Sequence, residues 1–148
     1  MILKSFETNK INLKHFKYFL FYGKNEGAKS EEIFKILNKF DLENVRKYDE
    51  KEIFQNKEGF FESLLSKSLF EKEKIIVVNR TTDKSLNIIE EIIDKDLLDL
   101  FIIFNSENLD KRSKLRSTFE KNKSLVCIPF YPDNNETLIK ITKDFLKE

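Results

Sequence analysis

Five short apolar runs recur along the chain, and segments of helical period separate them. The runs cover residues 18–22, 45–48, 74–78, 100–104 and 125–130. Strands that alternate with helices form parallel sheets, because each helix carries the chain back to the starting edge of the next strand. The run at 45–48 is the most polar of the five and is expected at a sheet edge. The sequence therefore predicts one α/β domain with a five-stranded, mainly parallel sheet and helices on both faces.

Apolar residues at helical spacing mark the segments between the runs. In the first, Ile33, Ile36, Leu37 and Phe40 follow the spacing i, i+3, i+4 and i+7. The later stripes are Phe61, Leu64 and Leu65; Leu86, Ile89 and Ile93; Leu115 and Phe119; and Leu138, Ile141 and Phe145. Asp133 is expected to cap the last helix, with Glu136 three residues on completing a capping box.

Composition narrows the possible functions. The chain has 148 residues and a net charge of +1, so it lacks the overall basic charge of a dedicated nucleic-acid binder. Its single cysteine, Cys127, and single histidine, His15, cannot supply a disulfide or a zinc site. We expect Cys127 in the core and His15 at the surface. With no apolar stretch long enough to span a bilayer and no signal-peptide pattern, a cytoplasmic protein with no membrane partner is expected.

Residues 23–30 read Gly-Lys-Asn-Glu-Gly-Ala-Lys-Ser, one residue away from a nucleotide-binding P-loop. Lys29 and Ser30 occupy the positions that reach the phosphates and magnesium. Ala28, however, replaces the glycine that lets the backbone approach phosphate, and Glu26 places a carboxylate inside the loop.

The two apolar runs that would carry a magnesium-binding acid also depart from the nucleotide-hydrolysis pattern. They end in Asn79-Arg80 and Asn105-Ser106, with no carboxylate at either tip. These departures favour a degenerate P-loop in which Gly23 and Gly27 permit a tight turn and no cofactor is bound. An active P-loop ATPase that uses Lys29 and Ser30 is the alternative.

A basic cluster opens the fourth helical segment. Its cations are Lys111, Arg112, Lys114 and Arg116. Such a cluster is usually a solvated helix face, and a DNA-binding module that uses these four side chains is the second alternative.

Three segments together resemble the delta subunit of bacterial DNA polymerase III, a clamp-loader subunit. Residues 19–27 are similar to the family's opening strand and degenerate loop. Residues 68–70, followed by the run at 74–78, are similar to its clamp-contacting helix end and next strand. Residues 105–115, which contain Leu-Asp-Lys-Arg-Ser-Lys-Leu, are similar to a loop of mixed chemistry and form the most specific match.

The resemblance implies a RecA-like, AAA+-type domain that binds and opens the DNA sliding clamp, the beta subunit, without hydrolysing ATP. Residues 1–148 would form this N-terminal domain alone. The lid and collar domains, through which gamma/tau and delta prime subunits would bind, are absent from this sequence, and DNA contact would be indirect. The domain itself would be non-catalytic, within a complex that acts as a DNA-directed DNA polymerase.

The resemblance also points to a clamp-binding element. Clamp-binding peptides resemble Gln-x-x-Leu-Phe, and here Ser66 stands at the glutamine position, followed by Ser68, Leu69 and Phe70. Adjacent residues lie about 100° apart around a helix, so Leu69 and Phe70 cannot both face the same sheet. One of the two should therefore protrude. Because Ser66 replaces the glutamine, the resemblance implies that the apolar pair is the main anchor on the clamp.

Overall fold

The computed structural model describes residues 1–10, 15–66 and 72–147. Its centre is a parallel sheet with the strand order β2-β3-β4-β1-β5. The strands are β1 (Tyr18–Tyr22), β2 (Val45–Asp49), β3 (Lys74–Asn79), β4 (Leu100–Asn105) and β5 (Val126–Pro129). The predicted five-stranded α/β fold is confirmed, and β2 lies at an edge as expected.

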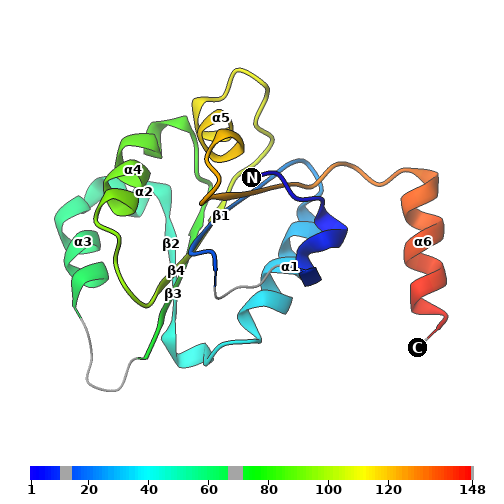
Figure 1. The fold of residues 1–148 in the computed structure, drawn as a ribbon, viewed down its shortest axis with the longest axis horizontal. Helices are drawn as coiled ribbons and strands as arrows, with labels where there is room; N and C mark the ends of the chain where they lie inside the picture. The colour runs from blue at the N-terminus through cyan, green and yellow to red at the C-terminus, as the bar shows by residue number, and fades with distance from the viewer. Residues whose placement is uncertain (11–14, 67–71, 148) are drawn as a thin grey trace.

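At least one helix follows each strand along the chain (Figure 1). They are α1 (Glu26–Leu37), α2 (Glu50–Gln55), α3 (Lys57–Leu65), α4 (Leu86–Asp94), α5 (Lys114–Lys121) and α6 (Asn135–Phe145). Short 3-10 turns in the described ranges accompany them: η1 (Ser5–Lys10), η2 (Leu42–Asn44) and η3 (Asp83–Ser85). None of the helices in the described ranges is both long and apolar enough to cross a membrane.

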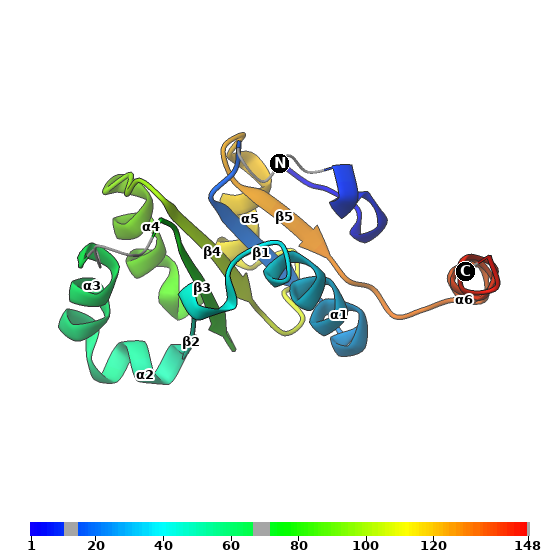
Figure 2. The same cartoon turned by 90° about the horizontal axis from the view of Figure 1, so that it is seen from below.

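The sheet is covered on both faces, as the apolar strands require. On one face, α1 packs its buried side chains Ile33, Ile36 and Leu37 against the sheet. Helices α2 to α5 cover the other face, where Leu115 and Phe119 of α5 are fully buried. Figure 2 shows α1 on one side of the strands and α2, α3 and α4 on the other. Cys127 lies in this core as predicted, where burial raises the pKa of its thiol to about 12.

Some sequence expectations for the helices are wrong. Helix α1 ends at Leu37, so Phe40 lies beyond it, although its ring still packs 5.1 Å from the Phe101 ring. In α3 the buried side chains are Phe60, Phe61 and Leu64, whereas Leu65 is 55% exposed. The helix presents Leu65 to solvent because residues one position apart point in different directions around its axis.

Helix α6 differs from the others in its surroundings. It stands apart from the sheet at the end of an extended segment (Figures 1 and 2). Its cap is Asn134, whose side chain accepts a hydrogen bond from Thr137 N, so the predicted Asp133 cap is off by one residue. The predicted stripe is present but is not buried: Leu138, Ile141 and Phe145 are all exposed.

The chain begins beside the sheet edge formed by β5. The Met1 α-amino group donates hydrogen bonds to three carbonyl oxygens, those of Phe119, Asn122 and Leu125. Two of these carbonyls lie at the C-terminal end of α5, where backbone acceptors lack helical partners. The ammonium therefore provides a hydrogen-bond donor for the backbone carbonyls at the C-terminal end of α5.

Candidate functional site

The turn after β1 carries the residues of the near P-loop. Gly23 has φ of 127°, and a Cβ there would lie 2.1 Å from the Phe130 carbonyl oxygen. Its N–H donates to the Glu107 carbonyl at 3.1 Å, and the Asn25 N–H donates to the Phe130 carbonyl at 3.3 Å. The turn is thus held between the segments that follow β4 and β5, and only glycine fits at its first position.

Helix α1 begins at Glu26, within the P-loop-like motif. Asn25 caps it, because its side-chain oxygen accepts the Ala28 N–H at 3.1 Å. In a P-loop the backbone between the two glycines wraps the phosphates. Here Glu26, Gly27 and Ala28 already belong to the first helical turn. The Ala28 N–H donates its hydrogen bond to the Asn25 side chain and is not free to bind phosphate.

Lys29 points into the protein. It is 1% exposed, and its Nζ donates to the Ser106 carbonyl at 2.5 Å and lies 2.7 Å from Glu26 Oε1. Ser30, the next residue, is exposed on α1. The Lys29 ammonium is therefore engaged by two groups of the protein itself, and Ser30 lies on a different side of the helix.

This lysine closes the place where folds of this type usually bind ligands. Strands β1 and β4 are neighbours, and the helices that follow them, α1 and α5, lie on opposite faces of the sheet. Ligands in open α/β sheets bind at such a switch point, beyond the carboxyl ends of the strands. Here the contacts Lys29–Ser106 and Gly23–Glu107 join the two segments across it.

The ends of β3 and β4 carry amides. Asn105 Nδ2 donates to Asn79 Oδ1 at 3.0 Å, so the two strand ends are joined by uncharged groups. Arg80, directly after Asn79, has φ of 56° and forms an ion pair with Asp49 at the end of β2. Among the described residues, no group of three or more His, Cys, Asp and Glu side chains could hold a metal ion.

A cavity of about 320 Å³ lies beyond the carboxyl ends of β2, β3 and β4. Its lining includes Glu50, a buried carboxylate that accepts hydrogen bonds from Thr82 N and Oγ1 and from Ser85 Oγ. Glu50 therefore ties α2 to η3, with its acceptors satisfied. Sequence reasoning missed this carboxylate, although the Asp49–Glu52 capping box beside it is a readable helix-start signal.

The predicted clamp-binding segment is described only at its start. Ser66 is the C-cap of α3, and its Oγ donates to the Ser63 carbonyl at 3.3 Å. Lys74 Nζ donates to the Ser63 carbonyl at 2.5 Å and contacts Ser66 Oγ at 3.5 Å, which joins the end of α3 to the start of β3. Ser68, Leu69 and Phe70 lie outside the described residues.

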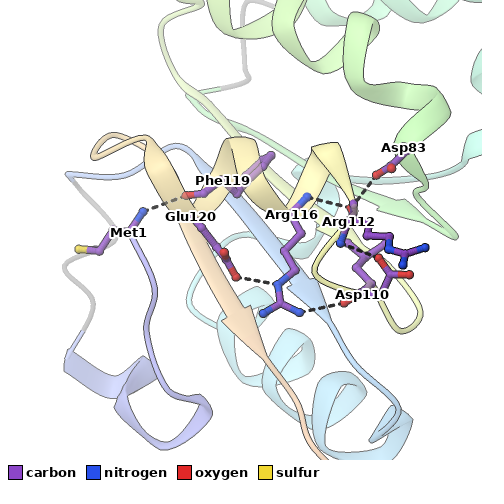
Figure 3. A network of polar contacts seen from close by, with 9 residues as sticks. Met1, Asp83, Asp110, Arg112, Arg116, Phe119 and Glu120 are labelled. Carbon is purple, nitrogen blue, oxygen red and sulfur yellow. Dashed lines mark hydrogen bonds and ion pairs between the residues drawn. The ribbon is translucent and has the colours of Figure 1, made fainter.

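The basic cluster is divided by the structure (Figure 3). Arg116 Nε lies 2.7 Å from Glu120 Oε1, its guanidinium donates to the Leu109 carbonyl, and it stacks 5.0 Å from the Tyr22 ring centroid. The hydrogen bond to Glu120 raises the pKa of Arg116 above its usual value. Lys111, Arg112 and Lys114 are exposed. Of the four cations, Arg116 thus forms contacts within the folded domain and has a structural role.

Asp83 of η3 binds the N-terminus of α5. Its carboxylate accepts hydrogen bonds from Ser113 Oγ at 2.6 Å and from the N–H groups of Lys114 and Leu115, both at 3.1 Å. Partial burial opposes ionisation, but the Ser113 and backbone hydrogen bonds outweigh it and lower the pKa of Asp83. The segment between β3 and α4 and the start of α5 are thereby linked through one carboxylate.

We expect Asp83→Asn to lower the free energy of unfolding at pH 7 by about 1 kcal/mol, because an amide is a weaker acceptor for these donors. The pKa of Asp83 is lower in the folded chain than in the unfolded chain. Its stabilisation is therefore complete above the unfolded-state pKa and is lost as pH falls through the folded-state pKa. Urea unfolding of both proteins from neutral to acidic pH should show their difference shrinking; a constant difference would contradict this role.

These features define an α/β domain built on a parallel sheet, in which a glycine turn and a buried lysine close the switch point. A family model described as DNA polymerase III, delta subunit, matches residues 19–128, and the chain belongs to that family. No curated protein sequence matches the chain.

A solved structure supports the same fold. The Bacillus subtilis DNA clamp loader delta protein (YqeN) superposes with a TM-score of 0.68 at 19% sequence identity. The match covers 97% of this chain and 47% of that protein. The chain therefore spans about half the length of this structural relative.

Proposed function

We propose that this chain is the clamp-binding domain of a clamp-loader delta subunit, which opens the DNA sliding clamp during replication by binding and without hydrolysing ATP. Membership of the delta family is the observation that carries the proposal. The fold shared with a clamp loader delta protein supports it. Opening follows if the domain binds the open ring more tightly than the closed ring, since a ligand shifts an equilibrium by its differential affinity.

The position of Lys29 supports a mechanism without nucleotide. The side chain that would reach the phosphates is buried and held by Ser106 and Glu26. The amides at the ends of β3 and β4 provide no carboxylate for magnesium there. No comparable observation favours the ATPase alternative.

Family membership also supports a proposal for the wider assembly. We propose that residues 1–148 are an AAA+-type N-terminal domain, and that lid and collar domains would follow it in the complete subunit. Gamma/tau and delta prime subunits would bind through those domains, and DNA would be contacted indirectly. The subunit would act in the cytoplasm. The 47% coverage of the structural relative is consistent with this division.

We assign the main clamp contact to Leu69 and Phe70. The described residues that flank this segment are Ser66, which Lys74 Nζ contacts at 3.5 Å, and Lys72, which lines a small hollow with Leu98 and Leu100. Two apolar side chains that enter a pocket on a partner are typical of interface hot spots, and each contributes about 1.5–3 kcal/mol when fully buried.

We expect Leu69→Ala combined with Phe70→Ala to weaken binding to the cognate sliding clamp at least about tenfold. Surface plasmon resonance with immobilised clamp measures the loss. Phe34→Ala is the control, because Phe34 is 64% exposed on α1, on the other face of the sheet. Equal affinities of the double variant and the unaltered chain would remove the assignment of the contact.

A further inference from the structure

Helix α6 is not held in place by packing of its own side chains. All of its residues are exposed, and none is buried against another element. The helix stands apart from the sheet at the end of the segment that follows β5 (Figure 2). The direction of α6 therefore depends on how that segment is held.

The segment after β5 is anchored at its first residue. Phe130 is buried, its ring lies 5.3 Å from the Phe21 ring, and its N–H donates to the Tyr22 carbonyl at 2.7 Å. The next side chain, that of Tyr131, is largely exposed and interacts with Tyr22. The chain thus leaves the core between Phe130 and Tyr131.

Asn25 binds the carbonyl groups of these two residues in succession. It belongs to residues 23–25, which we call the P-loop-like turn. The Asn25 N–H donates to the Phe130 carbonyl at 3.3 Å, and Asn25 Nδ2 donates to the Tyr131 carbonyl at 3.2 Å. Because Asn25 Oδ1 accepts the Ala28 N–H, the cap of α1 fixes Nδ2 as the amide atom that faces Tyr131. One residue therefore joins the start of α1 to the segment that leads to α6.

Little chain separates this contact from α6. Pro132 follows Tyr131 directly and restricts the backbone at both positions. Helix α6 begins at Asn135, with Asn134 as its cap. The Cα atoms of Tyr131 and Asn135 are four residues apart in the chain, so they are separated by at most about 14 Å. A contact at Tyr131 therefore limits where α6 can stand.

We propose that the P-loop-like turn binds the protein's own chain where a P-loop binds phosphate, and that Asn25 is the positioning residue for α6. N–H donors at a helix start suit the oxygens of phosphate and the oxygens of carbonyl groups alike. Gly23 allows this approach, because its Cα lies too close to the Phe130 carbonyl for a Cβ to fit. The turn in this way fixes the direction of α6 relative to the sheet. This role does not depend on clamp binding.

Spin labels on α1 and α6 test the positioning role. Phe34→Cys and Lys143→Cys place the labels at exposed positions of the chain, and Cys127 is buried and stays unlabelled. Pulsed electron paramagnetic resonance then measures the distribution of distances between the two helices. We expect a narrow distribution in the otherwise unaltered chain. Asn25→Asp keeps the oxygen that caps α1 but has no donor for the Tyr131 carbonyl, and it should broaden the distribution by roughly 5 Å or more.

Asn56→Asp is the matched control. Asn56 caps α3 in the same way, since its Oδ1 accepts the Gly59 N–H at 3.0 Å, but it lies between α2 and α3 on the other face of the sheet. We expect this variant to leave the distances unchanged. Circular dichroism should show that both variants retain their helices. Asn25→Ser also keeps a capping oxygen and has no amide donor, and it replaces Asn25→Asp if that variant does not fold.

Each outcome decides for or against the positioning role. A broader distribution in the Asn25 variant, with unchanged distances in Asn56→Asp, supports it. An unchanged distribution in the Asn25 variant overturns it, as does equal broadening in Asn56→Asp. A broad distribution in the otherwise unaltered chain also overturns it, because α6 would then not be held. Loss of the fold in both Asn25 variants overturns it as well, because the residue would then stabilise the whole domain.

Discussion

Gly23→Ala should lower the free energy of unfolding by roughly 3 kcal/mol or more, because the position combines a left-handed backbone with no room for a side chain. The added Cβ would meet the Phe130 carbonyl oxygen at 2.1 Å and its carbon at 2.7 Å. Relief of this clash requires the segment after β5 to move away, which removes its hydrogen bond to Asn25. Urea unfolding measured by circular dichroism gives the size of the loss.

Gly27→Ala is the matched control for this experiment. Its Cβ would meet only Asn25 Oδ1, at 3.9 Å, and the residue lies in the first turn of α1. Alanine there should leave stability unchanged or raise it by up to about 1 kcal/mol, because it restricts the unfolded chain. If both alanine variants lost similar stability, the distinction between the two glycines would be wrong.

Lys29→Ala should lower the free energy of unfolding by about 3–5 kcal/mol. The substitution removes a buried aliphatic stem, worth about 0.8 kcal/mol per methylene, and leaves the Ser106 carbonyl without its donor at a cost of about 1–3 kcal/mol. Lys29→Met keeps most of the stem and should lose about 1–3 kcal/mol. Chemical denaturation of the two variants gives the graded series.

Glu26→Gln supplies the control for the charge. Glu26 is largely exposed, so its ion pair with Lys29 should contribute about 1 kcal/mol or less.

Titration with Mg-ATP tests whether Lys29 binds nucleotide instead of stabilising the fold. A ligand at 100 times its dissociation constant would add roughly 2.7 kcal/mol, and we expect no such rise in melting temperature. A rise that disappears in Lys29→Ala would contradict the structural role.

The sequence predicts the sheet well because each strand carries its own signal. Four of the five strands begin at the predicted residue, and β5 begins one residue later, at Val126. A run of apolar, β-branched and aromatic residues is local information, and a strand buried on both faces shows it directly. The polar run at 45–48 likewise identified the edge strand β2.

Features that depend on distant residues could not be predicted. Lys29 has the position of a phosphate-binding lysine in the sequence, but its partner Ser106 lies 77 residues away. Asp83 similarly caps a helix that begins 31 residues later, at Lys114. The helical stripes predicted burial of Leu65 and Phe145, but both side chains are exposed. The stripe identifies an apolar residue but does not show whether another element packs against it. Periodicity gives a direction around a helix, whereas burial depends on the neighbouring elements.

The early start of α1 has a consequence for any attempt to engineer nucleotide binding. Ala28→Gly would complete the P-loop pattern in the sequence. The helix, however, already begins at Glu26, the Ala28 N–H is bonded to Asn25, and Lys29 is held by Ser106. A phosphate site would require the first turn to unwind, the lysine to turn outward and carboxylates to replace Asn79 and Asn105. One substitution would complete the sequence motif, whereas a working phosphate site would need several coupled structural changes.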